Sequence, residues 1–208
     1  MAKITWIHHA SVLIEGEKRV YVDPWKLEKL AKPAPADVVL ITHDHFDHLS
    51  VPDLERICTA ETEILAPKDA LQKLAGVPGR RRGVTAGMEV KVAGLPVKVV
   101  AAYNINTKFH PKAAGYVGYV LTIDGERIYH AGDTDRIAEM KGLAPDVALL
   151  PVGGTYTMTA SEAAQAAVDL GAKRVIPIHY GDIVGTVSDA QELKRLCQQP
   201  VDVLEPVG

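Results

Sequence analysis

The chain begins with short apolar runs that are bounded by turn residues. β-Branched runs predict strands at residues 4–7, 11–15 and 19–22, and the Glu-Gly-Glu-Lys turn at 15–18 makes an antiparallel meander of them. The apolar run Asp-Val-Val-Leu-Ile-Thr at 37–42 is typical of a strand that is buried on both faces. The pattern then predicts a helix at 52–58, a strand at 63–66 and a helix at 68–74.

The Gly/Pro/Arg segment at residues 76–83 separates this half from a second set of elements. Strands are predicted there at 89–92, 97–102, 117–123, 127–130, 146–151, 174–178 and 201–204, and helices at 161–170 and 188–196. Because hairpin strands and strand–helix units occur in both halves, we expect two mixed β-sheets packed face to face with helices outside. This is an α/β fold, a four-layer αββα sandwich. The length of 208 residues fits one domain, residues 1–208, better than two.

The composition is that of a globular protein, with 47% hydrophobic and 24% charged residues. The net charge of −3 and a single dense basic run, Arg80 to Arg82, disfavour nucleic acid as a partner. Cys58 and Cys197 form no Cys-x-x-Cys pair and are expected to be reduced thiols. The chain has no membrane-length apolar stretch and no signal-peptide pattern, so we expect a cytoplasmic protein without a membrane partner. A homo-oligomer is compatible with these features.

Histidine is abundant: the chain has eight histidines beside two Phe and two Trp. Three of them follow the predicted buried strand directly, in the sequence His43-Asp-His45-Phe-Asp47-His48. Imidazole and carboxylate groups suit zinc, iron and manganese, and a loop that leaves a rigid strand can wrap several side chains around one site. So many donors could serve two ions, which hydrolases place ~3.5–4 Å apart. A solvated polar turn is the alternative interpretation.

Two later apolar runs also end in residues that bind metals. Asp133 closes the run Ile-Tyr-His-Ala-Gly-Asp, and His179 follows Val-Ile-Pro-Ile. A His or Asp at the end of a strand is more often a cap or a surface residue than a ligand. Together with the histidine cluster, however, both become candidates for remote ligands.

These motifs resemble the metallo-β-lactamase superfamily over about residues 4 to 205. The resemblance rests on the His43-x-His-x-Asp-His48 motif, the Gly-Asp133-Thr turn and His179 in Ile-Pro-Ile-His-Tyr-Gly. More narrowly, four segments are similar to the ascorbate-6-phosphate lactonase-like branch, which includes many uncharacterised prokaryotic metal-dependent hydrolases. They are residues 6–14, 21–24, 130–134 and 153–158. The resemblance implies the αββα sandwich.

The resemblance also implies a ligand set for two divalent ions, with zinc expected and manganese, iron or nickel as alternatives. The first ion would bind His43 and His45, the second Asp47, His48 and His179, and Asp133 would bridge them.

One ligand of the family pattern is missing from this chain. The family's third histidine for the first ion stands in an Ala-aromatic-His sequence, whereas this chain has Ala102-Tyr103-Asn104. Either His110 replaces it, or Asn104 provides a weak oxygen ligand and His110 is left for the substrate. If neither binds, a mononuclear enzyme results.

Other residues near the motifs have expected roles beside the metals. Asp47 could also orient the attacking water, and His9 could contact a substrate phosphate or protonate a leaving group. Asp23 could fix the ligand loop through hydrogen bonds, or simply belong to a turn. We expect His8 and His130 to be structural.

Two loops could shape the pocket. Residues 155–157 (Thr-Tyr-Thr) could form its rim, although turn chemistry before a capped helix is the preferred explanation. The loop at 104–115, with Lys108 and Lys112, could cover the metals and attract an anionic substrate, or its lysines could simply be solvated.

The function expected from these features is that of a metal-dependent hydrolase. A metal-activated hydroxide would cleave a small anionic phosphoester or lactone, so that no Ser or Cys nucleophile is required. Two alternatives stand beside it. A nuclease has relatives in the superfamily, against which the acidic net charge argues. A non-catalytic metal-binding or sensing protein is suggested by the departure at Asn104.

Overall fold

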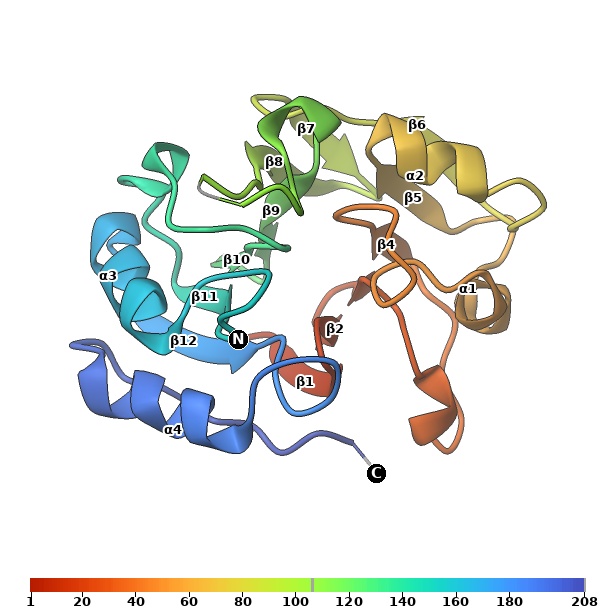
Figure 1. The fold of residues 1–208 in the computed structure, drawn as a ribbon. Helices are drawn as coiled ribbons and strands as arrows, with labels where there is room; N and C mark the ends of the chain where they lie inside the picture. The colour runs from red at the N-terminus through yellow and green to blue at the C-terminus, as the bar shows by residue number, and fades with distance from the viewer. Residues whose placement is uncertain (106, 208) are drawn as a thin grey trace.

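The computed structural model describes residues 1–105 and 107–207. Residue 106 belongs to the loop that is expected to cover the metals, and residue 208 ends the predicted domain; both lie outside the described residues. Within the described residues, the strands form two six-stranded sheets. Figure 1 shows these sheets facing one another, with helices α1 and α2 outside one sheet and α3 and α4 outside the other.

The first sheet has the strand order β1-β2-β3-β4-β5-β6. Its strands are β1 (Lys3–His8), β2 (Ser11–Glu15), β3 (Arg19–Val22), β4 (Val38–Leu40), β5 (Glu63–Ala66) and β6 (Arg80–Gly83). The first three form the predicted antiparallel meander, with Trp6 opposite Val12 and Val12 opposite Val22. The strands from β3 to β6 are parallel. Parallel neighbours need crossovers, which contain η1 (Leu27–Lys29), α1 (Val51–Ile57) and α2 (Lys68–Lys73).

The second sheet has the order β12-β11-β10-β9-β8-β7. Its strands are β7 (Glu89–Val92), β8 (Leu95–Ala101), β9 (Val117–Ile123), β10 (Glu126–His130), β11 (Val147–Pro151) and β12 (Arg174–Ile178). β7 to β10 are antiparallel, and β10 to β12 are parallel. The remaining elements are η2 (Lys112–Ala114), η3 (Ala138–Met140), α3 (Ala160–Leu170) and α4 (Val187–Leu196). A capping box of Thr159 and Glu162 starts α3, and Gly171 ends it at φ +67°.

The apolar side chains form two cores. The larger core joins the facing sides of the two sheets, including Val20 and Val38 from the first sheet and Leu121 and Ile128 from the second, and it continues beneath α3 and α4. The smaller core, around Leu54, lies between the outer face of the first sheet and its helices. The predicted four-layer αββα sandwich of two mixed sheets is therefore confirmed.

Residues 80–83 differ from the sequence prediction, which treated them as part of a separating segment. They form β6, an edge strand that pairs only with β5. All four residues are exposed, so the strand lacks the apolar signal by which strands are predicted. Charged residues on an edge strand discourage pairing with a second molecule. The basic run therefore lies along a sheet edge, where Arg80 contacts Glu61 at 2.8 Å.

The predicted strand at residues 201–204 is also wrong, because only Val201 pairs, in a single parallel bridge with Val175. Val175 N–H donates to Pro200 O, and Asp202 N–H donates to Val175 O. The next bond of a parallel ladder would come from the backbone nitrogen of Pro177, which carries no hydrogen. The pairing therefore stops after one residue.

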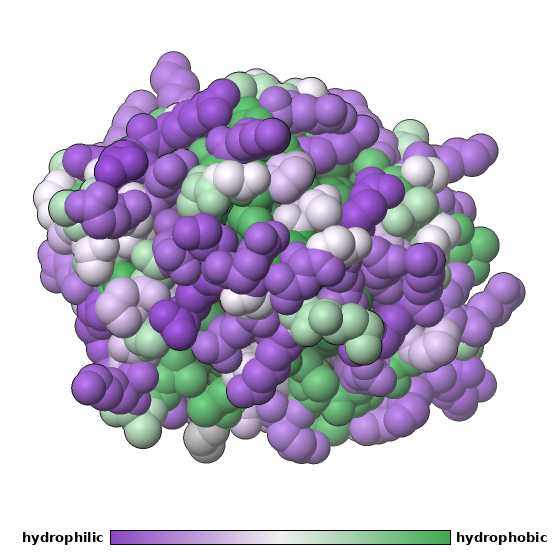
Figure 2. Space-filling view, turned by 180° about the vertical axis from the view of Figure 1, so that it is seen from behind, coloured by the Kyte–Doolittle hydropathy of each residue, from purple (hydrophilic) through white to green (hydrophobic). Residues whose placement is uncertain are grey.

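The face opposite to that seen in Figure 1 is mainly polar. Figure 2 shows the molecule from behind, with hydrophilic side chains predominating and hydrophobic atoms visible between them. In the described part of the chain, no helix has both the length and the apolar character needed to cross a bilayer.

Candidate metal centre

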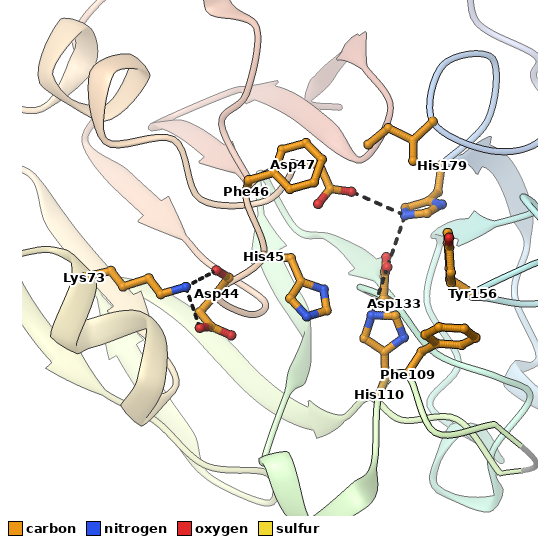
Figure 3. Close-up of a pocket in the computed structure, with 11 residues that line it drawn as sticks. Asp44, His45, Phe46, Asp47, Lys73, Phe109, His110, Asp133, Tyr156 and His179 are labelled. Atoms are coloured by element: carbon orange, nitrogen blue, oxygen red, sulfur yellow. Dashed lines mark hydrogen bonds and ion pairs between the residues drawn. The ribbon is translucent and has the colours of Figure 1, made fainter.

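Polar side chains from both sheets meet at one edge of the sandwich (Figure 3). Residues 43–48 follow β4, Asp133 follows β10, and His179 follows β12. His9 stands in the β1–β2 turn, and His110 enters from the connection between β8 and β9. The carboxyl ends of parallel strands lie at the same edge of a sheet, so residues that are distant in sequence become neighbours there.

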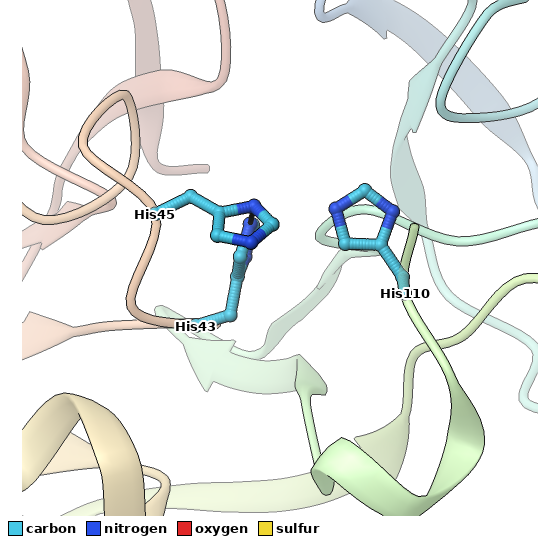
Figure 4. A group of neighbouring side chains, drawn as sticks. All are labelled: His43, His45 and His110. Carbon is cyan, nitrogen blue, oxygen red and sulfur yellow. Dashed lines mark hydrogen bonds between the residues drawn. The ribbon is translucent and has the colours of Figure 1, made fainter. Parts of the chain in front are cut away.

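These side chains form three groups in which the ligand atoms lie within 4.8 Å of one another. The groups are His43, His45 and His110; His43, His48 and Asp133; and His9, Asp47 and His179. Figure 4 shows the first group, in which His45 and His110 approach from different loops. His43 Nε2 and His45 Nδ1 are 3.1 Å apart. Two nitrogens ~2.1 Å from one tetrahedral ion would be separated by a similar distance, roughly 3.4 Å.

Asp133 lies between the groups. Its Oδ1 is 3.3 Å from His48 Nε2, and its Oδ2 is 3.1 Å from His179 Nε2 and 3.4 Å from His110 Nε2. Gly132, at φ +65°, lets the backbone before Asp133 pass close to β9, where a Cβ would lie 2.9 Å from Val117 O. The carboxylate thus occupies the position that a group shared by two ions would need.

Several of the donor atoms have no hydrogen-bond partner. Several buried atoms have no hydrogen bond in the described structure: both ring nitrogens of His9 and of His179, Nε2 of His48 and of His110, and Oδ1 of Asp133. Each unpaired buried polar group costs roughly 1–3 kcal/mol. Divalent cations accept such nitrogen and oxygen donors, so the residues present fit one or more metal ions.

Asp23 and Thr42 hold two of the histidines from behind. Asp23 Oδ2 accepts from Thr42 Oγ1 at 2.6 Å and from His48 Nδ1 at 2.7 Å. Thr42 Oγ1 in turn lies 2.9 Å from Nδ1 of His43, from which it can accept. With Nδ1 of both rings used in this way, Nε2 of both is left facing the site. This geometry favours the predicted supporting role of Asp23 over a plain turn.

Asn104 supports His110 in the same manner. Its Nδ2 donates to Asp135 Oδ1 at 2.8 Å and to the Tyr156 carbonyl at 2.9 Å. These bonds turn Oδ1 toward His110 Nδ1, 2.9 Å away, which then donates to it. The Asn104 oxygen is therefore occupied, and His110 presents Nε2 to His43 and His45.

Burial sets the protonation of most donors. It lowers the pKa of His43 and His110, and it lowers that of His9 to about 4, so these rings are neutral at pH 7. Burial alone would raise the pKa of Asp133, but His179 and His48 outweigh it and hold it well below its usual range. Neutral imidazoles and ionised carboxylates are the forms that bind metals.

His48 is the exception among the histidines. Burial opposes its protonation, but the carboxylates of Asp133 and Asp23 outweigh burial and raise its pKa well above the usual value. In the metal-free chain, the imidazolium of His48 thus provides a positive charge beside the carboxylates of Asp133 and Asp23.

His9 is fully buried and is not among the residues that line the cavity described below. Its contact with a substrate phosphate or leaving group stays a prediction. Its ring lies against that of His179, with centroids 3.8 Å apart, and its Nε2 is 3.4 Å from Asp47 Oδ2. A substrate would have to displace neighbouring side chains to reach it. His9 belongs to the donor group around Asp47.

The remaining two histidines have structural contacts, as predicted. His130 is buried, its Nε2 lies 2.9 Å from Ala10 O, and its Nδ1 accepts from Gly132 N–H at 3.2 Å. His8 is partly exposed, and its Nε2 lies 2.7 Å from Asp182 Oδ2.

A cavity of about 520 Å³ opens directly above the donors. It is lined by Asp44, His45, Phe46, Asp47, Lys73, Phe109, His110, Asp133, Tyr156, His179 and Ile183. Sequence reasoning did not assign five of these: Asp44, Phe46, Lys73, Phe109 and Ile183. The first two lie inside the histidine motif and Phe109 precedes His110, so proximity to the motifs was the available signal. Lys73 and Ile183 carried no such signal.

The two loops expected around the pocket behave differently. Tyr156, from the predicted rim, does line the cavity. Neither Lys108 nor Lys112 does, and Lys112 Nζ instead contacts Glu139 at 2.7 Å. The predicted attraction of an anion by these two lysines therefore has no support in this geometry.

Comparison with known proteins agrees with the fold, and it relates the chain to proteins that are named metal-dependent hydrolases. Residues 3–179 match the family model described as a beta-lactamase superfamily domain. A UPF0173 metal-dependent hydrolase of Methanoregula boonei is 36% identical, over 96% of this chain and 91% of its own. A Parabacteroides distasonis structure described as a metal-dependent hydrolase is 34% identical, with a TM-score of 0.86, over 99% of this chain and 93% of that chain. Igni18, a metallo hydrolase of Ignicoccus hospitalis, is 27% identical, with a TM-score of 0.80, over 100% of this chain and 96% of that chain.

The chain therefore belongs to the metallo-β-lactamase superfamily, within a family whose members are named metal-dependent hydrolases. This confirms the superfamily that the sequence motifs indicated. The narrower resemblance to the lactonase-like branch stays a prediction.

Proposed function

We propose that the chain is a dinuclear metal-dependent hydrolase that cleaves a small phosphoester or lactone. The observation that carries the proposal is the set of buried, unpaired nitrogen and oxygen donors at the floor of an open cavity. The proposed ligands are His43, His45 and His110 for the first ion, and Asp47, His48 and His179, supplemented by His9, for the second, with Asp133 between them. Zinc is the proposed metal, because three-histidine and mixed His/Asp donor sets suit it.

When bound, ions of this kind acidify a water molecule and polarise the oxygen of a scissile bond. The chain's own residues supply orientation and proton handling. Asp47 Oδ2 lies 3.4 to 3.9 Å from the Nε2 atoms of His9, His48 and His179, so the carboxylate is held at the cavity floor. Burial would raise its pKa, but His48 and His9 lower it far below the usual range, so Asp47 is an anion that can accept a hydrogen bond from water.

The described residues that line the cavity include no Ser, Thr or Cys that could serve as a hydroxyl or thiol nucleophile. Cys58 is buried in the smaller core, where burial raises the pKa of its thiol to about 12. The thiol is therefore neutral at pH 7. These observations favour a water-derived nucleophile over a covalent Ser or Cys intermediate.

A nuclease is less well supported than a small-molecule hydrolase. The basic run lies on β6, outside the cavity lining, and the one cation of that lining, Lys73, bonds to Asp44 Oδ2 at 2.7 Å. A polynucleotide would need additional unpaired cations along its backbone.

Activity after metal removal and reloading tests the proposal. The chain is stripped with a chelator, reloaded separately with Zn²⁺, Mn²⁺, Fe²⁺ or Ni²⁺, and assayed on phosphodiesters, phosphomonoesters, lactones, DNA and RNA. We expect reloading to restore hydrolysis of a small ester by roughly 100-fold or more over the stripped chain. A chain with its full complement of metal that hydrolyses none of these substrates would contradict the enzyme and support a metal-binding or sensing protein. Cleavage of DNA or RNA alone would support the nuclease.

A further inference from the structure

Apolar side chains surround the mouth of the cavity. The chain has only two phenylalanines, and both line it: Phe46 is 68% exposed and Phe109 is 45% exposed. Ile183 adds a third apolar group at 39% exposure. In the view of Figure 3, Phe46 and Phe109 lie on opposite sides of Asp133. Large apolar side chains exposed together at the mouth of a cavity mark a binding surface.

These rings are held in place by their neighbours. Phe109 meets the ring of Tyr156 edge to face, with centroids 4.7 Å apart and an interplanar angle of 83°. Phe46 meets Trp25 in the same way at 6.0 Å and 82°. Aromatic pairs of this kind fix ring orientation. The apolar walls are thus built before any ligand arrives, while both side chains remain partly exposed to solvent.

The cavity offers little to a strongly charged ligand besides the metal donors. Among the described lining residues, Lys73 is the one cation, and its Nζ bonds to both Oδ2 and the carbonyl of Asp44 at 2.7 Å. Asp44 is held in turn by the Tyr116 hydroxyl at 3.2 Å. Sites that select phosphate dianions place unpaired Arg or Lys side chains around them. Here the lysine is already neutralised.

We propose that the substrate is an apolar ester: a phosphodiester or lactone that carries an alkyl chain next to the scissile bond, seated between Phe46 and Phe109. The proposal rests on the proposed function, since the scissile group is placed at the donor cluster. It narrows the small anionic phosphoester or lactone that the sequence predicts to a substrate with at most one negative charge and a sizeable apolar substituent.

Matched ester pairs test this choice of substrate. Methyl and hexyl p-nitrophenyl phosphate share their charge, leaving group and intrinsic reactivity, and γ-butyrolactone and γ-decalactone differ in the same hexyl group. For the metal-loaded chain, we expect kcat/KM to be roughly 30-fold higher for the hexyl member of the hydrolysed pair, because each buried methylene adds up to about fourfold. Equal values for the two members would overturn the proposal and leave the hydrolase intact.

Variants of the two phenylalanines test whether the preference for the hexyl ester arises at the mouth of the cavity. In Phe46→Ser/Phe109→Ser we expect the ratio of kcat/KM for the hexyl ester to that for the methyl ester to fall below about threefold. The control is Val168→Ser/Val187→Ser, which removes two exposed apolar side chains, 48% and 60% exposed, from α3 and α4; it should keep the full preference. An unchanged preference in the double phenylalanine variant would contradict the assignment.

Binding separates this proposal from the proposed function. The affinities of methylphosphonate and hexylphosphonate for the metal-loaded chain are compared by calorimetry. Tighter binding of the hexyl compound without hydrolysis of any ester would support the apolar pocket and count against the enzyme. Equal affinities would overturn the apolar pocket whatever the activity.

Discussion

Replacing His110 with alanine is expected to reduce bound metal from two ions per chain to about one and to lower kcat/KM roughly 100-fold or more. The reason is geometric: His110 is buried, its Nε2 has no hydrogen-bond partner, and it completes the donor group of His43 and His45. Without His110 the first ion would keep only His43, His45 and the carboxylate that it shares with the second ion, one protein ligand fewer than in the complete site. Metal content by mass spectrometry and steady-state kinetics on the same preparation provide the measurement.

Two further variants make this experiment specific. His8→Ala changes a partly exposed histidine that contacts Asp182 away from the donors, and it should alter neither metal content nor kcat/KM. Asn104→Ala should weaken metal binding by about 10- to 100-fold at preserved maximal stoichiometry, because it removes only the acceptor that orients His110. Full metal and wild-type turnover in His110→Ala would show that the first ion does not depend on this histidine.

Replacing Asp133 with asparagine is expected to have an even larger effect, abolishing measurable turnover and the thermal stabilisation by metal. Its two oxygens contact His48, His179 and His110, so the loss of its charge affects both proposed ions. For the wild-type chain, a free metal concentration of 100 Kd stabilises by ~2.7 kcal/mol per site. This corresponds to a rise in Tm of roughly 5–10 °C for a chain of this size.

Thermal unfolding with and without chelator measures this effect independently of activity. The control is Asp182→Asn, which removes a carboxylate that contacts His8 and Lys26 outside the donor groups. It should keep the full increase in Tm. If Asp133→Asn showed the same increase as the wild-type chain, Asp133 would not be a shared ligand.

The pattern of apolar residues was sufficient to predict most of the fold. Strands such as β4 and β11 consist entirely of buried residues and stand out in the sequence. β6 does not, because an edge strand of arginines pairs through its backbone alone. The prediction of a strand at 201–204 was wrong for a comparable reason. Its pairing with β12 would need a backbone N–H at position 177, where the chain has a proline.

The site was predictable where ligands follow buried strands in short motifs. The placement of His110 was not, because it depends on how the loop after Asn104 returns to the sheet edge, which has no periodic signal. The sequence also could not show that Asn104 supports His110, because this requires the contacts of its side chain with Asp135 and Tyr156. The sequence did not predict the apolar side chains at the cavity mouth, because the exposure of a phenylalanine depends on the fold around it.

The central claim is that strand ends of both sheets assemble a site for two ions around Asp133. Anomalous scattering from crystals of the wild-type chain grown with Zn²⁺ tests it most directly. We predict two peaks ~3.5–4 Å apart on either side of Asp133, one of them ~2.0–2.1 Å from ring nitrogens of His43, His45 and His110. A single peak, or peaks that lie away from these side chains, would contradict it.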